Sequence, residues 1–261
     1  MTESVSRALA IAHTTLREIL RGKVLVATFG FALILVAIVS LFGAVTIGDQ
    51  AKVIKDFGLF TVSLFPVGFA VVSGSSLLHQ ELSRKTIYNV LSKPVRRSEF
   101  VAGKFLGMVG TSTVLLFMLA ATLSIYLKFF EGTFDRLLFQ AYALCWFEVV
   151  LMCGVALFFS SLVVTPALSG LFSFGVFLAG RSTEILLYFI SEGSIRGPAE
   201  WILKSLYWGL PHLSSLYVSN GIVHGTGVTA SFILVSGAYA LSYAALLLFF
   251  AQALFSRRDF N

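Results

Sequence analysis

Charged residues are scarce in this sequence. Asp, Glu, Lys and Arg make up 12% of the 261 residues, whereas 57% are hydrophobic, and an ordinary soluble domain carries roughly 25% charged residues. Several apolar runs approach the ~20 residues that cross the hydrocarbon core of a bilayer as a helix. The scarcity of charge excludes an ordinary soluble domain and predicts an all-α integral membrane protein.

Cysteine is almost absent, and the motifs of catalysis are missing. Cys145 and Cys153 both fall in one apolar run, where small packing residues are expected rather than a disulfide or a metal site. The sequence holds no G-x-x-x-x-G-K-[ST], H-E-x-x-H or G-x-S-x-G pattern. Ser75 and His79 stand four residues apart, but helix contacts explain serines in such a run better than an intramembrane protease does. We therefore expect no catalytic residue, no metal ion and no cofactor bound by this chain.

Six apolar segments predict six transmembrane helices in a single transmembrane domain, residues 1–261. The first has 24 residues and begins at Val24, which is too long and too late for the core of a cleavable signal peptide. Pro66 and Gly68 are expected to kink the second. The fifth ends either at Gly180 or near Ile190. The expected spans are residues 24–47, 57–78, 105–127, 141–164, 166–180 and 228–255.

Arg181 and Glu184 follow the fifth segment at a spacing of three residues. Two readings stay open for this pair. The two side chains neutralise each other on one helix, or they mark the membrane boundary.

The net charge of +6 lies in short segments between the apolar runs. That distribution is typical of a topology signal and does not suggest nucleic acid as a partner. With the N-terminus inside, 12 Lys and Arg fall in inside segments and 7 in outside segments. The bias predicts a multi-pass protein in the lipid bilayer with both termini in the cytoplasm.

Residues 1–22 are amphipathic and lead directly into the first span. Apolar residues recur at helical spacing, and the opposite side of the helix carries polar and charged residues, including Glu18 and Arg21. Such a basic amphipathic helix is expected to lie in the membrane interface. The alternative is a soluble helix that packs on a partner.

Residues 181–227 form the longest stretch outside the expected spans, on the external side. Trp201, Tyr207 and Trp208 are side chains that favour a membrane–water interface. We expect short interfacial helices here, broken at Pro198 and Pro211.

Glu148 is the one charged residue well inside an expected span. An ionised side chain near the bilayer centre costs roughly 2.5 to 3.5 kcal/mol on insertion scales, so it usually faces a cavity or a polar partner. Glu148 is therefore expected either to line a pathway or gate, or to hold helices together through hydrogen bonds.

The loop at residues 79–104 concentrates charge between the second and third spans. It contains 8 charged residues between positions 81 and 104, of which 6 are basic. A topology signal accounts for the positive charge. The stretch also has helix-forming residues before Pro94, and Ser98 with Glu99 as a helix start. These features favour a rigid cytoplasmic surface that docks a soluble partner.

The same loop resembles the cytoplasmic coupling loop of permease subunits in the type-2 exporter (ABC-2-type) class of ABC transporters. The matching positions are Glu81, Thr86, Leu91, Ser92, Pro94, Val95, Arg97, Glu99, Phe100 and Lys104. The N-terminal segment with Arg17, Glu18 and Arg21 is similar to the family's interfacial elbow helix. Residues 211–214 and 255–260 also look like the family, so the resemblance covers nearly the whole chain.

The resemblance implies a non-catalytic membrane subunit of an exporter in a prokaryotic cytoplasmic (inner) membrane. A separate ABC ATPase subunit would use ATP and Mg²⁺, and a second permease subunit, expected to be an identical copy, would complete the pathway. ATPase docking would fall to the coupling helix, at Glu81, Arg84, Lys85, Thr86, Tyr88, Leu91, Arg96 and Arg97. The alternative is a membrane anchor that recruits a cytoplasmic ATPase without moving a solute. A membrane-embedded enzyme is disfavoured.

Overall fold

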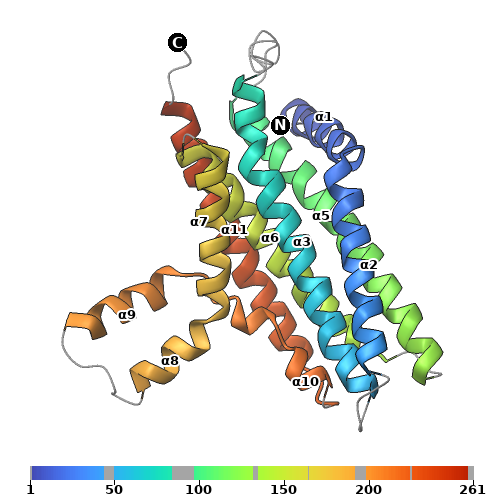
Figure 1. Ribbon diagram of the computed structural model, residues 1–261. Helices are drawn as coiled ribbons and strands as arrows, with labels where there is room; N and C mark the ends of the chain where they lie inside the picture. The colour runs from blue at the N-terminus through green and yellow to red at the C-terminus, as the bar shows by residue number, and fades with distance from the viewer. Residues whose placement is uncertain are drawn as a thin grey trace.

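The computed structural model of the chain describes residues 2–43, 50–83, 97–131, 135–163, 165–191, 198–223 and 225–257. These residues are helical apart from short connections, and none of them forms a strand, which confirms the all-α fold class. Figure 1 shows an upright bundle with a lateral arm formed by two short helices. The helices are α1 (Thr2–Leu20), α2 (Lys23–Gly43), α3 (Gln50–Ser83), α5 (Arg97–Glu131), α6 (Leu137–Leu162), α7 (Pro166–Arg181), α8 (Thr183–Ser191), α9 (Pro198–Gly209), the 3₁₀ helix η1 (Ser214–Leu216), α10 (Ser219–Val223) and α11 (Ala230–Arg257).

A helix stands at each of the six predicted spans, but the helices differ in their capacity to cross a bilayer. Four are long and apolar enough among the described residues: Ala51–Leu77, Ser98–Phe129, Leu137–Leu162 and Ala230–Phe255. The bent pair Ser6–Leu20 and Leu25–Ile38 brings the number of candidate spans to five. Helix α7 has 16 residues, about 24 Å, which is less than the ~30 Å hydrocarbon core.

Helix α6 is the centre of the bundle. It packs against α3, α5, α7 and α11, and 17 of its 26 residues are buried. Cys145 and Cys153 are buried free thiols on this helix, as the sequence predicts. A helix that is apolar on all sides belongs in the interior of a bundle, because it has no polar face to present to water.

Small residues set the distances between the central helices. A Cβ atom on Gly154 of α6 would come within 3.3 Å of the Ala244 Cα atom of α11, and a Cβ on Gly74 of α3 would come within 2.7 Å of the Ala156 Cβ atom. Helices in lipid gain little from the hydrophobic effect between them, so close backbone approach and van der Waals contact hold them together.

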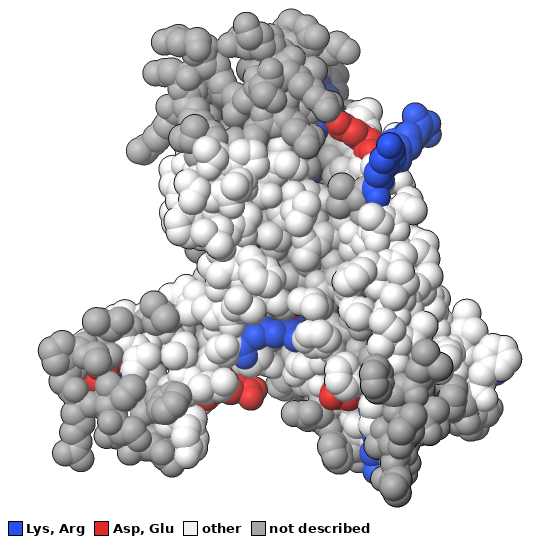
Figure 2. Space-filling model, viewed as in Figure 1, with Lys and Arg blue, Asp and Glu red and all other residues white. Residues whose placement is uncertain are grey.

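Helix α1 lies against the first half of α5, on a row of three glycines. A Cβ atom at Gly103 would meet Ile11, one at Gly107 would meet Thr15, and one at Gly110 would meet Leu16, each within 2.6 to 2.7 Å. The helix predicted at the N-terminus is therefore present. Placement in the membrane interface stays a prediction. The charged residues Arg17, Glu18 and Arg21 are exposed, and Figure 2 shows charged side chains over this part of the molecule.

The predicted docking loop lies largely outside the described residues. Arg84, Lys85, Thr86, Tyr88, Leu91 and Arg96 are among residues 84–96, and only the helix ends on either side, Glu81 in α3 and Arg97 in α5, are placed. Glu99 stands in the first turn of α5, where a carboxylate favours the helix dipole. Three residues of the family-like pattern, Glu99, Phe100 and Lys104, are buried, so they support the base of the loop instead of facing a partner.

The contact of α1 with the glycine row on α5 can be tested by a glycine-to-alanine substitution, which adds a single methyl group. Gly107→Ala places its Cβ atom 2.8 Å from the Ala12 carbonyl oxygen and 2.6 Å from the Thr15 Cβ atom. Because backbone cannot yield cheaply, α1 must shift, and we expect the free energy of unfolding to fall by about 1–3 kcal/mol. Thermal unfolding in detergent and the rate of proteolytic release of α1 measure the effect.

Gly68→Ala on α3 is the matched control, because no atom lies within 4 Å of its Cβ position. That change should raise stability by roughly 0.5–1 kcal/mol, the ordinary gain of alanine over glycine in a helix. Equal effects of the two substitutions would show that α1 is not held by the glycine row.

Candidate functional site

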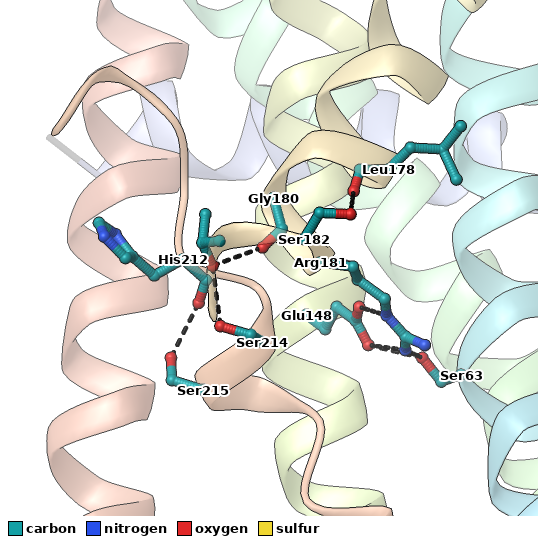
Figure 3. A network of polar contacts seen from close by, with 10 residues as sticks. Ser63, Glu148, Leu178, Gly180, Arg181, Ser182, His212, Ser214 and Ser215 are labelled. Atoms are coloured by element: carbon teal, nitrogen blue, oxygen red, sulfur yellow. Dashed lines mark hydrogen bonds and ion pairs between the residues drawn. The ribbon is translucent and has the colours of Figure 1, made fainter. Parts of the chain in front are cut away.

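A buried ion pair joins three helices in the bundle interior. The Glu148 carboxylate projects from α6, and the Arg181 guanidinium lies at the last residue of α7. Arg181 Nε donates to Glu148 Oε1 at 3.0 Å, and Nη2 donates to Oε2 at 3.1 Å. This is the two-pronged contact in which a guanidinium fork matches a carboxylate. Figure 3 shows both side chains pointing toward α3.

Ser63 of α3 completes the pair. Its hydroxyl donates to Glu148 Oε2 at 2.6 Å and accepts a short hydrogen bond from Arg181 Nη2. One hydroxyl therefore serves the cation and the anion together. The Glu148 carboxylate, fully buried, receives three hydrogen bonds from two partners. This satisfies the requirement that a charge removed from water be paired and hydrogen-bonded.

Two aromatic rings enclose the guanidinium. The Arg181 Cζ atom lies 5.2 Å from the centroid of the Phe177 ring and 3.8 Å from that of Tyr217. Both distances are within the range of a cation–π contact, which gains strength where water is excluded. Tyr217 follows η1, so the same guanidinium connects α7 with the segment between α9 and α10.

That segment also covers the end of α7. The Gly180 carbonyl oxygen accepts hydrogen bonds from the Leu213 backbone N–H at 3.1 Å and from the Thr183 hydroxyl at 2.9 Å. A Cβ atom at Gly180 would lie 2.7 Å from the Pro211 carbonyl oxygen, so only glycine permits this approach. The last carbonyl groups of a helix need such partners when the end is buried.

The covering segment lies deep along α11. The His212 backbone N–H donates to the Tyr239 hydroxyl at 3.0 Å, and the Tyr243 hydroxyl donates to the Gly209 carbonyl at 3.0 Å. Tyr239 stands nine residues beyond Ala230, the start of α11, which is about 14 Å along the helix. Irregular backbone at such depth is tolerated where protein groups take its hydrogen bonds. After the α8–α9 arm, the chain thus returns to the middle of the bundle, as Figure 1 shows.

The two charges of the pair are unequally accessible. The Glu148 side chain is 0% exposed, whereas that of Arg181 is 16% exposed. Figure 2 shows a basic spot in the hollow between the arm and the lower part of the bundle. A solute that reaches the pair therefore meets the guanidinium first, and the site as a whole is electrically neutral. Among the described residues no three His, Cys, Asp or Glu side chains gather in a way that could hold a metal ion.

The sequence indicates part of this site. Glu148 is buried and has polar partners on two other helices, α3 and α7, and its expected role in a pathway or gate stays a prediction. Of the two readings left open for Arg181 and Glu184, mutual neutralisation is contradicted, because Arg181 pairs with Glu148 and Glu184 is exposed. Ser63 was missed. A serine within an apolar run carries no distinguishing signal until its neighbours in space are known.

Short helices in residues 181–227 are confirmed. Pro198 is the first residue of α9, and Pro211 follows that helix directly after Leu210. Trp201 and Trp208 on α9 are highly exposed, which is consistent with a membrane-interface position. That position and the external side remain predictions.

Removing one charge of the ion pair should be costly, and removing both should not be. Arg181→Met leaves a buried carboxylate without its cation, and loss of one partner in a buried pair lowers the free energy of unfolding by about 3–5 kcal/mol. The double variant Glu148→Leu with Arg181→Met should be more stable than either single variant, because no uncompensated charge remains. Thermal unfolding of the purified chain in detergent measures the three values.

Lys204→Met is the control for loss of a salt bridge as such. Lys204 pairs with Glu200 at 2.7 Å on α9, with both side chains exposed, and should contribute less than about 1 kcal/mol. A double variant as unstable as the sum of its single variants would contradict the direct coupling of Glu148 and Arg181.

One comparison with known proteins covers nearly the whole chain. A family model described as ABC-2 family transporter protein matches residues 9–260. No curated protein matches the chain. The matched region contains α2 through α11 and residues 9–20 of α1, which confirms the resemblance carried by the loop pattern. The family model fits nearly the full length of this helical bundle. The chain is thus a multi-pass membrane protein that belongs to the ABC-2 transporter family.

Proposed function

We propose that this chain is the permease subunit of an ABC exporter, driven by ATP hydrolysis in a separate ATPase subunit. The observation that carries the proposal is the family match over residues 9–260. The sequence itself has no phosphate-binding loop, in agreement with an ATPase on another chain. Six membrane-crossing helices, counting α2 and α7, with both termini in the cytoplasm of a prokaryotic cell, complete the proposed arrangement.

The proposed route for coupling runs through the ends of α3 and α5. Residues 79–104 would dock on the ATPase, with the basic side chains setting register and Leu82, Ile87, Tyr88 and Leu91 supplying apolar contact. Below this loop, α5 carries α1 on its glycine row and α3 contributes Ser63 to the ion pair. A push on the loop would therefore reach the elbow helix and the pair through two continuous helices, a rigid-body type of switch.

The Glu148–Arg181 pair is the proposed gate. It joins α3, α6 and α7 at one point, and Arg181 also contacts Tyr217 of the covering segment. A paired charge in a dry interior has few acceptable positions, because any movement that separates it must supply new partners. We propose that the pair holds one packed state of the bundle and that a second state, facing a second permease copy, rearranges it.

A membrane anchor that only recruits an ATPase is the alternative function. It would need the docking loop but no pathway and no gate. The buried ion pair favours the exporter, because a polar site deep in the bundle costs stability that an anchor does not need.

The first prediction on coupling concerns Arg96 and Arg97. Reversing both to Glu should remove the partner ATPase from the chain while leaving the chain in the membrane, since the docking surface changes by four charge units. Affinity purification from native membranes in mild detergent, followed by mass spectrometry, measures the ratio of ATPase to permease. We expect that ratio to fall at least tenfold.

The matched control reverses two exposed lysines far from the loop, Lys52 at the start of α3 and Lys204 on α9. This variant should retain the ATPase at the native ratio. Retention of the ATPase by the Arg96 and Arg97 variant, under cross-linking and in replicate, would overturn the proposed docking surface. Recovery of the native chain with no ATPase would count against the exporter itself.

The second prediction separates a transporter from an anchor. Glu148→Gln keeps the shape of the side chain but leaves the Arg181 charge uncompensated, so the two packed states should no longer be balanced. We expect the ATPase to stay bound, and ATP turnover of the complex in nanodiscs to change at least fivefold. A Ser182→Cys reporter, one residue from Arg181 and half-buried, should lose its ATP-dependent change in reactivity toward a membrane-impermeant maleimide.

Lys204→Gln on the exposed arm is the control, and it should behave as the native chain. An anchor would show no ATP-dependent change in reactivity at position 182 even before Glu148 is altered. That result, with the ATPase bound, would replace the exporter by the anchor.

A further inference from the structure

A groove of about 750 Å³ runs between α5 and α6, on the side of α6 away from the ion pair. Thr113, Phe117 and Ile125 of α5 form one wall, and Phe139, Tyr142 and Trp146 of α6 form the other. Its volume falls within the roughly 300–1,000 Å³ of ordinary ligand pockets. Three of its aromatic or aliphatic side chains, Phe117, Phe139 and Ile125, are more than half exposed.

The polar groups on the walls already have partners. Trp146 Nε1 donates to Thr113 Oγ1 at 2.9 Å, and the Ser124 and Tyr142 hydroxyls share a hydrogen bond at 2.9 Å. These two contacts bridge α5 and α6 across the floor of the groove. An occupant gains dispersion and apolar burial here and few hydrogen bonds, which selects a hydrocarbon segment.

The groove has the length of one membrane leaflet. Thr113 to Ile125 spans 12 residues of helix, about 18 Å, and half of the hydrocarbon core is about 15 Å. Thr113 stands at the middle of the candidate span Ser98–Phe129, and Phe139 stands near the start of the span Leu137–Leu162. The groove therefore extends from the bilayer centre to the boundary at the α5–α6 turn.

Basic residues stand where the groove meets that boundary. Lys128 follows Ile125 by three residues on α5, and Arg136 is the N-cap residue of α6, three residues before Phe139, so each lies next to the end of one wall. Both are exposed. The acidic neighbour Asp135 is held by Lys55 at 2.9 Å. Cations at the interface end of a crevice between transmembrane helices favour the phosphate of a lipid headgroup.

We propose that this groove is a binding site for one phospholipid, with an acyl chain along Thr113–Ile125 and the phosphate beside Arg136. The apolar groove lies toward the bilayer centre and the basic residues lie at the boundary. A phospholipid in its leaflet has the matching order, with acyl chains toward the centre and an anionic phosphate at the boundary. The site is separate from the ion pair, so its occupancy does not depend on whether the chain exports or anchors.

The test uses Trp146 as a reporter inside the groove. In a Trp201→Phe and Trp208→Phe background, Trp146 is the one remaining tryptophan. Phosphatidylcholine brominated on its acyl chains is titrated into the detergent-purified chain, and the quenching of tryptophan fluorescence is recorded. We expect saturable quenching at about one lipid per chain, reversed by unbrominated phosphatidylcholine.

Variants separate the acyl chain from the headgroup. Ala121→Phe fills the groove and should raise the half-saturating lipid concentration at least tenfold, whereas Ala238→Phe, on an exposed position of α11, should change it less than twofold. Arg136→Glu should raise it about fivefold and Lys52→Glu should not. Brominated diacylglycerol, which lacks the phosphate, should bind at least fivefold more weakly than the phospholipid.

Two results would overturn the proposal. Non-saturable quenching that Ala121→Phe and Ala238→Phe alter equally would mean that ordinary boundary lipid surrounds Trp146. Absence of quenching, together with a disulfide between two chains that each carry Ala121→Cys, would make the groove a contact between subunits.

Discussion

A guanidinium held against a carboxylate inside an apolar bundle constrains everything around it. Helix α7 has 16 residues, and its last turn ends inside the bundle. Arg181 stands at that end, and its charge is tolerated there because Glu148 and Ser63 meet it on one side and Phe177 and Tyr217 on the others. This one charge therefore connects the end of α7 with α3, with α6 and with the segment that follows η1.

The other close contacts between the helices occur at glycine residues, which have no side chain. Gly74 and Gly154 each lie where a Cβ atom would approach a neighbour within about 2.7 to 3.3 Å, and α6 takes part in both crossings. Gly180 makes an equally close approach to the Pro211 carbonyl oxygen of the covering segment. Such contacts give little latitude, because an added methyl group must displace backbone. The bundle is thus tight where small residues meet, and the groove between α5 and α6 is open where aromatic side chains hold the two helices apart.

Much of the fold could be predicted from the sequence, because the length of each hydrophobic segment and the distribution of charge along the chain are local properties. Six helices stand where six apolar runs occur, and the amphipathic pattern of residues 1–22 forms α1. The site around the Glu148–Arg181 ion pair could be predicted only in part. Glu148 is conspicuous because a charge within an apolar run needs a partner, but nothing in the chain identifies Arg181, 33 residues away, as that partner. The neighbouring Glu184 is the pairing that sequence spacing suggests, and tertiary contact overrides it. The pattern in residues 81–104 indicated the family for a different reason. Its residues are recognised together by their types and spacing in the sequence, and this recognition needs no knowledge of their contacts in space.

The row of glycines beneath α1 has a consequence for the order in which the protein is assembled. Helix α1 leaves the ribosome well before the surface on which it rests, because Gly103, Gly107 and Gly110 are synthesised about 90 residues later. At roughly 5–20 residues per second, the helix exists for several seconds before its resting place does. During that interval the surface of the membrane is the available cover for its apolar side. If α1 first lies in the membrane interface, as its sequence predicts, the same amphipathic sequence serves two successive environments, lipid headgroups during biosynthesis and a neighbouring helix in the finished bundle.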